Sequence, residues 1–86
     1  MGTDSSSTMD MKLAAADGPA RITFEPGGTA FTLAAEEFLT LRLEPDVVPA
    51  VEITVWPNGI SVWLPYPGES DYIVLDSEGR EVARLW

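Results

Sequence analysis

Apolar and polar residues alternate in short runs along most of the chain from residue 20 onward. The segments 21–25 and 29–33 each place two large apolar residues on one face, and Pro26-Gly27-Gly28 separates them. A period of two is typical of a half-buried strand, and a short connection that contains Gly is typical of a hairpin turn. These residues therefore predict a first β-hairpin.

The next run, residues 38–44, alternates three leucines with polar residues and so predicts another half-buried strand. A helix near 33–43 is the competing interpretation. Thr32 could cap that helix, and Glu36 and Glu37 would then lie in its first turn, where acidic residues are favourable. The strict alternation and the strand-like neighbours favour the strand.

The strongest hairpin pattern lies at residues 51–56 and 60–64, which Pro57-Asn58-Gly59 connects. Pro fixes φ at the start of the turn, and Gly suits the left-handed position that closes a three-residue loop. A loop of this length predicts that Trp56 faces Ile60, which leaves both faces of the hairpin apolar. One face then holds Val51, Ile53, Val55 and Trp63, and the other holds Trp56, Ile60, Val62 and Leu64.

The last third of the chain resumes after two prolines, which lack the N–H that a central strand needs. Residues 72–76 and 80–86, joined by Ser77-Glu78-Gly79, predict a final hairpin. About seven short strands at this spacing predict an all-β fold, a small antiparallel β-sandwich or barrel. If residues 33–43 are helical instead, the fold is α+β.

The composition changes near Pro19, because Ser, Thr, Asp, Met and Ala precede it and β-branched and aromatic residues follow it. This change predicts a flexible N-terminal arm at residues 1–19 and a single β domain at residues 20–86. The first residues carry acids and serines rather than a basic export signal, and charges interrupt every apolar run. We therefore expect a cytoplasmic protein that does not enter a membrane.

Charge and residue types exclude several classes of function. Fourteen Asp and Glu against five Lys and Arg give a net charge of −9, which repels nucleic acid. The sequence contains no His and no Cys, so the usual base near neutral pH, the thiolate nucleophile and the soft metal ligands are missing. We expect no catalytic residues, no cofactor and no nucleic-acid partner.

Four acidic residues in the last third raise the question of a calcium site: Asp71, Asp76, Glu78 and Glu81. A calcium-binding loop needs acids at alternate positions, then Gly, then a Glu six residues further on, and Asp76-Ser77-Glu78-Gly79-Arg80-Glu81 supplies only a fragment of this pattern. We therefore interpret them as a polar hairpin turn and expect no metal site.

Four of the eight aromatic residues lie between Trp56 and Tyr72. A two-sheet fold buries one face of each sheet, so the predicted register leaves one apolar face of the 51–64 hairpin to be covered by the arm, another layer or a partner. Trp63 is expected in the core. The candidate partner-binding residues are Trp56, Ile60, Val62, Leu64 and Tyr66.

The resulting hypothesis is a non-catalytic, acidic interaction or accessory domain that binds a protein partner or itself. An acidic surface suits a basic partner, and a small core would gain from a homodimer. The alternative is a carbohydrate-binding sandwich that presents Trp56 with Tyr66 or Tyr72 as an aromatic platform. Trp86 is a further exposed-aromatic candidate, unless it only fixes the last strand in place.

Overall fold

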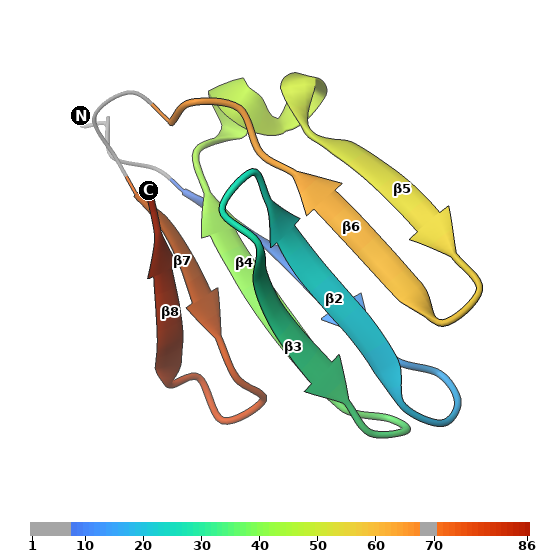
Figure 1. The fold of residues 1–86 in the computed structure, drawn as a ribbon. Coiled ribbons are helices and arrows are strands. Elements are labelled where there is room, and N and C mark those ends of the chain that lie inside the picture. Colours follow the sequence, from blue (N-terminus) through green and yellow to red (C-terminus); the bar gives the residue numbers. More distant parts are fainter. Residues whose placement is uncertain (1–7, 68–70) are drawn as a thin grey trace.

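The computed structural model describes residues 8–67 and 71–86. In this part of the chain, eight strands form two four-stranded sheets that pack face to face (Figure 1), which confirms the expected all-β sandwich. The strands are β1 (Met9–Ala14), β2 (Ala20–Glu25), β3 (Thr29–Leu33), β4 (Phe38–Leu43), β5 (Glu52–Trp56), β6 (Gly59–Trp63), β7 (Tyr72–Leu75) and β8 (Glu81–Leu85), with a 3₁₀ helix η1 (Pro45–Ala50) between β4 and β5.

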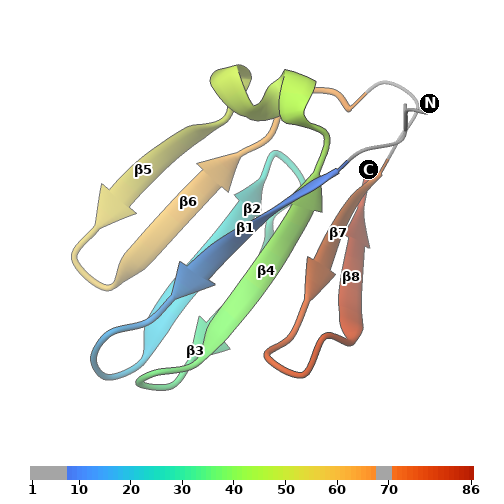
Figure 2. The ribbon, with the colours of Figure 1, turned by 180° about the vertical axis from the view of Figure 1, so that it is seen from behind.

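Sheet A has the strand order β1-β4-β7-β8, and sheet B has the order β3-β2-β6-β5. Neighbouring strands run antiparallel, as expected, with the exception of β2 and β6, which run parallel. The β2–β6 pair joins the β2–β3 hairpin to the β5–β6 hairpin within sheet B. Between these two hairpins the chain forms β4, which belongs to sheet A (Figure 2). A parallel contact of this kind depends on segments far apart in the sequence.

The core lies between the sheets and takes every second residue of each central strand. In β4 the three leucines of the alternating run are buried. Val74 of the neighbouring strand β7 and Val62 of β6 in the other sheet are fully buried as well. This alternation is the reason that 38–43 is a strand, so the alternative helix near 33–43 is wrong. The buried core residues are Leu13, Ala15, Ile22, Phe24, Leu33, Leu39, Leu41, Leu43, Val62, Leu64, Tyr72 and Val74.

Part of the predicted arm belongs to the fold. Residues 9–14 form β1, which pairs along its whole length with β4 and contributes Leu13 to the core. The Asp10 carboxylate accepts two hydrogen bonds from the Arg42 guanidinium across this pair, at 2.9 and 3.1 Å. The prediction of a flexible arm at 1–19 is therefore wrong for this strand, while residues 1–7 lie outside the described residues.

The β5–β6 hairpin differs from its predicted register by one residue. Trp56 pairs with Gly59, so the loop contains Pro57 and Asn58 alone, and Gly59 lies in β6 without a left-handed backbone. A Cβ built on Gly59 would overlap the backbone carbonyl of Arg21 on β2. Gly occupies this position because β2 approaches β6 closely, and the turn does not require it.

Candidate functional site

The corrected register separates the five predicted partner-binding residues. Val62 and Leu64 are buried in the core, and Ile60 is half-buried against it. Trp56 is exposed on the opposite face of sheet B, because opposed residues share a face and Trp56 is opposite Gly59. Tyr66 is exposed in the segment after β6. The five residues therefore do not share one exposed face, as the predicted register required.

The same shift brings Trp56 and Trp63 onto one surface, the outer face of sheet B. Glu52 pairs with Trp63 and Thr54 pairs with Ser61, so these residues alternate outward together with Trp56. Trp63 is 45 % exposed rather than part of the core, contrary to expectation. The Trp56 indole N–H donates a hydrogen bond to the Ser61 hydroxyl at 2.9 Å, which ties the edge of that ring to β6.

The strand β5 is an edge of sheet B and exposes large apolar residues on both faces. Val55 is 78 % exposed, Trp56 54 % and Ile53 43 %. Val55 and Ile53 point to the inner side of the sheet, because they pair with Ile60 and Val62 of β6. No strand of sheet A overlaps β5 in Figure 1 or in the reverse view of Figure 2, which agrees with this exposure. We call Ile53, Val55, Trp56 and Trp63 the hairpin surface.

A second aromatic group lies at the end of sheet A next to a cavity of about 330 Å³. Trp86 packs edge-on against Tyr66 and Tyr72, with ring centroids 6.1 and 6.2 Å apart. The buried Tyr72 hydroxyl donates a hydrogen bond to the Pro65 carbonyl at 2.5 Å. Burial, together with the nearby Glu44 charge, raises the pKa of Tyr72. Trp86 therefore packs against Tyr66 of the segment before β7 and Tyr72 of β7, and it is also 51 % exposed, so the structure agrees with both interpretations of this residue.

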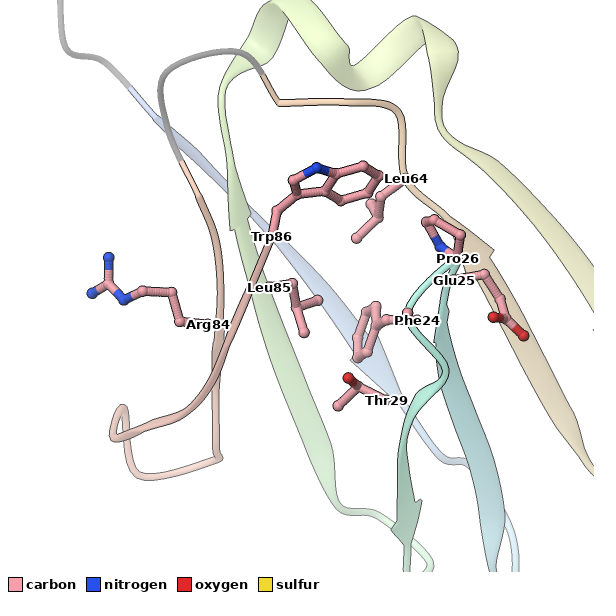
Figure 3. A pocket seen from close by; sticks show the side chains of 9 residues that line it. Phe24, Glu25, Pro26, Thr29, Leu64, Arg84, Leu85 and Trp86 are labelled. Atoms are coloured by element: carbon pink, nitrogen blue, oxygen red, sulfur yellow. The ribbon is translucent and has the colours of Figure 1, made fainter.

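The cavity itself is apolar. Phe24, Leu64 and Leu85 point into it, and the indole of Trp86 lies along its upper side (Figure 3). The charged ends of Glu25 and Arg84 point away from it in the same view. The Thr29 hydroxyl is a further polar group of the lining.

Two of the four acidic residues, Asp76 and Glu78, lie in the polar turn between β7 and β8, whereas Asp71 precedes β7 and Glu81 is the first residue of β8. The Asp76 carboxylate accepts hydrogen bonds from the backbone N–H groups of Glu78 and Arg80, each at 2.9 Å. The Arg80 backbone hydrogen bond is the largest cause that lowers the pKa of Asp76. Arg84 forms ion pairs with Glu81 and Asp71. In residues 8–67 and 71–86 no group of three or more acids is arranged to hold a metal ion.

No protein-family model, no curated protein and no solved structure matches this chain. The described residues contain no helix with the length and apolar content that a membrane crossing requires. The hairpin surface is accordingly the feature of the described chain on which a functional proposal can be built.

Proposed function

We propose that this chain is a non-catalytic protein-interaction domain that binds its partner through the hairpin surface. The observation that carries the proposal is the exposure of Ile53, Val55, Trp56 and Trp63, between 43 and 78 %, on a single hairpin at the edge of sheet B. Removing apolar area from water contributes about 25 cal/mol per Å². The two Trp lie on the outer face of this hairpin and the two aliphatic residues on the inner face. Exposed Trp is typical of the energetic centre of an interface, and exposed apolar side chains mark interaction sites.

The distribution of charge supports the same surface. The chain carries a net charge of −9, yet β5 and β6 together contain one charged residue, Glu52. Interface centres are depleted of charged residues, while the rim and the remaining surface stay polar. The acidic residues of the rest of the molecule repel polyanions. This hairpin, which has little charge, is then the surface that we expect to bind a protein.

Affinity capture with two matched variants tests the proposal. Val55→Lys places a charge on the hairpin surface, and Val82→Lys makes the same change on β8, where Val82 is also exposed. We expect the unmodified chain and the Val82→Lys variant to retain the same protein, identified by mass spectrometry and then confirmed with purified components. The Val55→Lys variant should lose it by at least about tenfold, which corresponds to about 1.4 kcal/mol.

A second copy of the chain counts as a partner in this experiment. Equal binding by all three proteins, together with unchanged binding by Trp63→Ala on the outer face, would contradict the proposal, because the contact would then involve neither face of the hairpin. Circular dichroism of each variant provides the folding control.

A carbohydrate ligand is the second candidate, and one observation favours it. Trp56 and Trp63 lie on the same outer face, and the hydroxyl-bearing residues Thr54 and Ser61 occupy the positions between them. Indole faces with adjacent hydroxyl groups suit the stacking and hydrogen bonding of a sugar chain. A glycan array distinguishes the two candidates, because sugar binding should depend on Trp63 and tolerate Val55→Lys, whose side chain points to the other face.

A further inference from the structure

We propose that the partner of the hairpin surface is a second copy of this chain, paired antiparallel through β5 with Thr54 on the two-fold axis. The inference rests on the proposed function and names its partner. Two sheets B would then join edge to edge into one continuous eight-stranded sheet, since each has four strands. The first argument concerns the backbone of β5, the second its register, and the third the other sheet edges.

The free side of β5 presents backbone groups that can pair. Because Trp56 and Gly59 flank a two-residue loop, they form a hydrogen-bonded pair, and alternate residues of β5 therefore face β6. Ile53 and Val55 lie between them and turn their N–H and C=O groups toward the free edge. In the proposed dimer, Ile53 of each copy exchanges backbone hydrogen bonds with Val55 of the other.

The register follows from the symmetry. A two-fold axis perpendicular to the sheet sets each residue opposite one that points to the same face, so the axis must pass through a residue. Thr54 is the middle residue of the five in β5, and centring there pairs all of them. Ile53 then faces Val55, and Glu52 faces Trp56. This arrangement matches apolar residues with each other and keeps the two carboxylates from facing one another.

The second copy would partly cover apolar side chains on the inner side of β5. Val55 and Ile53 are exposed there, and Ile60 of β6 is only partly covered. Pairing would place Ile53 and Val55 of both copies next to each other in one apolar strip that neither copy of sheet A covers. Cross-strand pairs of aliphatic residues stabilise a sheet, and this strip exists only when two copies meet.

Two of the other three edges, β1 and β8, carry charges that protect them against pairing. Among the described strands, β1 carries Asp10 and Lys12, and β8 carries Glu81 and Arg84, so both edges present charges. The edge strand β3 has no charged residue, but both its large apolar side chains turn toward the core. Charged edges resist the addition of a strand, whereas β5 carries a single acid at one end, Glu52.

The absence of cysteine from the sequence makes a direct test of the register straightforward. Thr54 would lie opposite itself, with Cα atoms about 4.5 Å apart, which is within the range that a disulfide spans. In the same dimer, two copies of Val55 would be diagonal neighbours about 7–8 Å apart, which is beyond that range. Thr54→Cys should therefore form a disulfide-linked dimer under mild oxidation, and Val55→Cys should do so at least about tenfold less.

Sedimentation equilibrium from low micromolar to near-millimolar concentration supplies the second measurement. We expect the mass of the unmodified chain to rise toward that of a dimer, and the Val55→Lys variant to raise the dissociation constant at least about tenfold while Val82→Lys leaves it unchanged. Since each copy has a net charge of −9, added salt should strengthen the dimer by screening repulsion, whereas it would weaken the binding of a basic protein.

A single-chain mass at the highest concentration, or a disulfide yield that is no greater for Thr54→Cys than for Val55→Cys, would overturn the dimer. If such a monomer still captured a purified partner that Val55→Lys releases, the dimer would be wrong and the proposed function would stand. If capture were also insensitive to both Val55→Lys and Trp63→Ala, which change opposite faces of the hairpin, both would be wrong.

Discussion

The hairpins β5–β6 and β7–β8 each consist of one inner strand and one edge strand, but their edge strands differ in exposed residue types. Each contributes an inner strand whose Val is fully buried, Val62 and Val74, and each ends its sheet with an edge strand. The edge strand β8 carries Glu81 and Arg84, which form an ion pair, whereas β5 exposes three large apolar residues. The core requires the same pattern of both inner strands, so the difference between the edge strands is not a consequence of folding. This difference is the observation on which the proposed binding role of β5 rests.

The largest expected effect concerns one aromatic residue from each hairpin. Tyr72 of β7 is buried and hydrogen-bonded to Pro65, while Trp63 of β6 lies on the outer face. Tyr72→Ala should lower the free energy of unfolding by about 3–5 kcal/mol, because it leaves a cavity in the core. Trp63→Ala should lower it by about 1 kcal/mol or less, since most surface changes have small effects.

Denaturant unfolding followed by circular dichroism, at a concentration low enough to keep the chain monomeric, measures both changes. A large loss of stability for Trp63→Ala would break the comparison. It would mean that the outer face of β6 is covered by something other than solvent.

The second prediction compares a glycine from each hairpin. Gly59 meets the backbone of Arg21, and Gly79 has a φ of 85° with open space around its Cβ position. At Gly59, both Ala and Asn should cost about 1–3 kcal/mol, because either Cβ would push β2 away from β6. At Gly79, Ala should cost about 1–2 kcal/mol, and Asn should cost less, because Asn tolerates the left-handed conformation.

The same unfolding measurement applied to all four variants separates a steric requirement from a conformational one. If Asn restored stability at position 59 relative to Ala, the contact with Arg21 would not be the reason for Gly there. The two hairpins would then share a single turn chemistry.

Local patterns predicted most of the strands, because alternation and turn residues act over a few positions. The same signal was present in Met9, Met11 and Leu13, which alternate with polar or small residues along β1. The change of composition at Pro19 obscured it. Strands that pair with distant segments, such as β2 with β6, leave no comparable local mark.

The candidate site was harder to predict for the same reason. Pro57-Asn58-Gly59 allows a loop of two or three residues, and the sequence shows neither the neighbouring β2 nor its contact with Gly59. A register shift of one residue exchanges the two faces of a strand. It moved Trp63 out of the core and Val62 into it. The sequence therefore indicated that the aromatic residues of this hairpin matter, but not which of them lie on the same face.

The smallest expected effect is a pH dependence in the turn of the protected hairpin. Backbone N–H groups of Arg80 and Glu78 bind the Asp76 carboxylate and lower its pKa below the ordinary value of 3.8. The carboxylate form therefore stabilises the folded chain above the pKa of the unfolded state, and this contribution is lost as the pH falls through the lower pKa of the folded state.

Asp76→Asn keeps an acceptor oxygen but removes the titration. We expect this variant to be less stable than the unmodified chain at neutral pH. The difference should begin to shrink below about pH 4, where the carboxyl of the unfolded chain takes up a proton, and should disappear only below the lower pKa of the folded chain. Urea unfolding at a series of pH values measures this difference, with Ser77→Ala as a control in the same turn that keeps the carboxylate. A difference that stays constant down to acidic pH would show that the charge of Asp76 contributes nothing, and that its hydrogen bonds alone distinguish this turn from the Pro57-Asn58 loop.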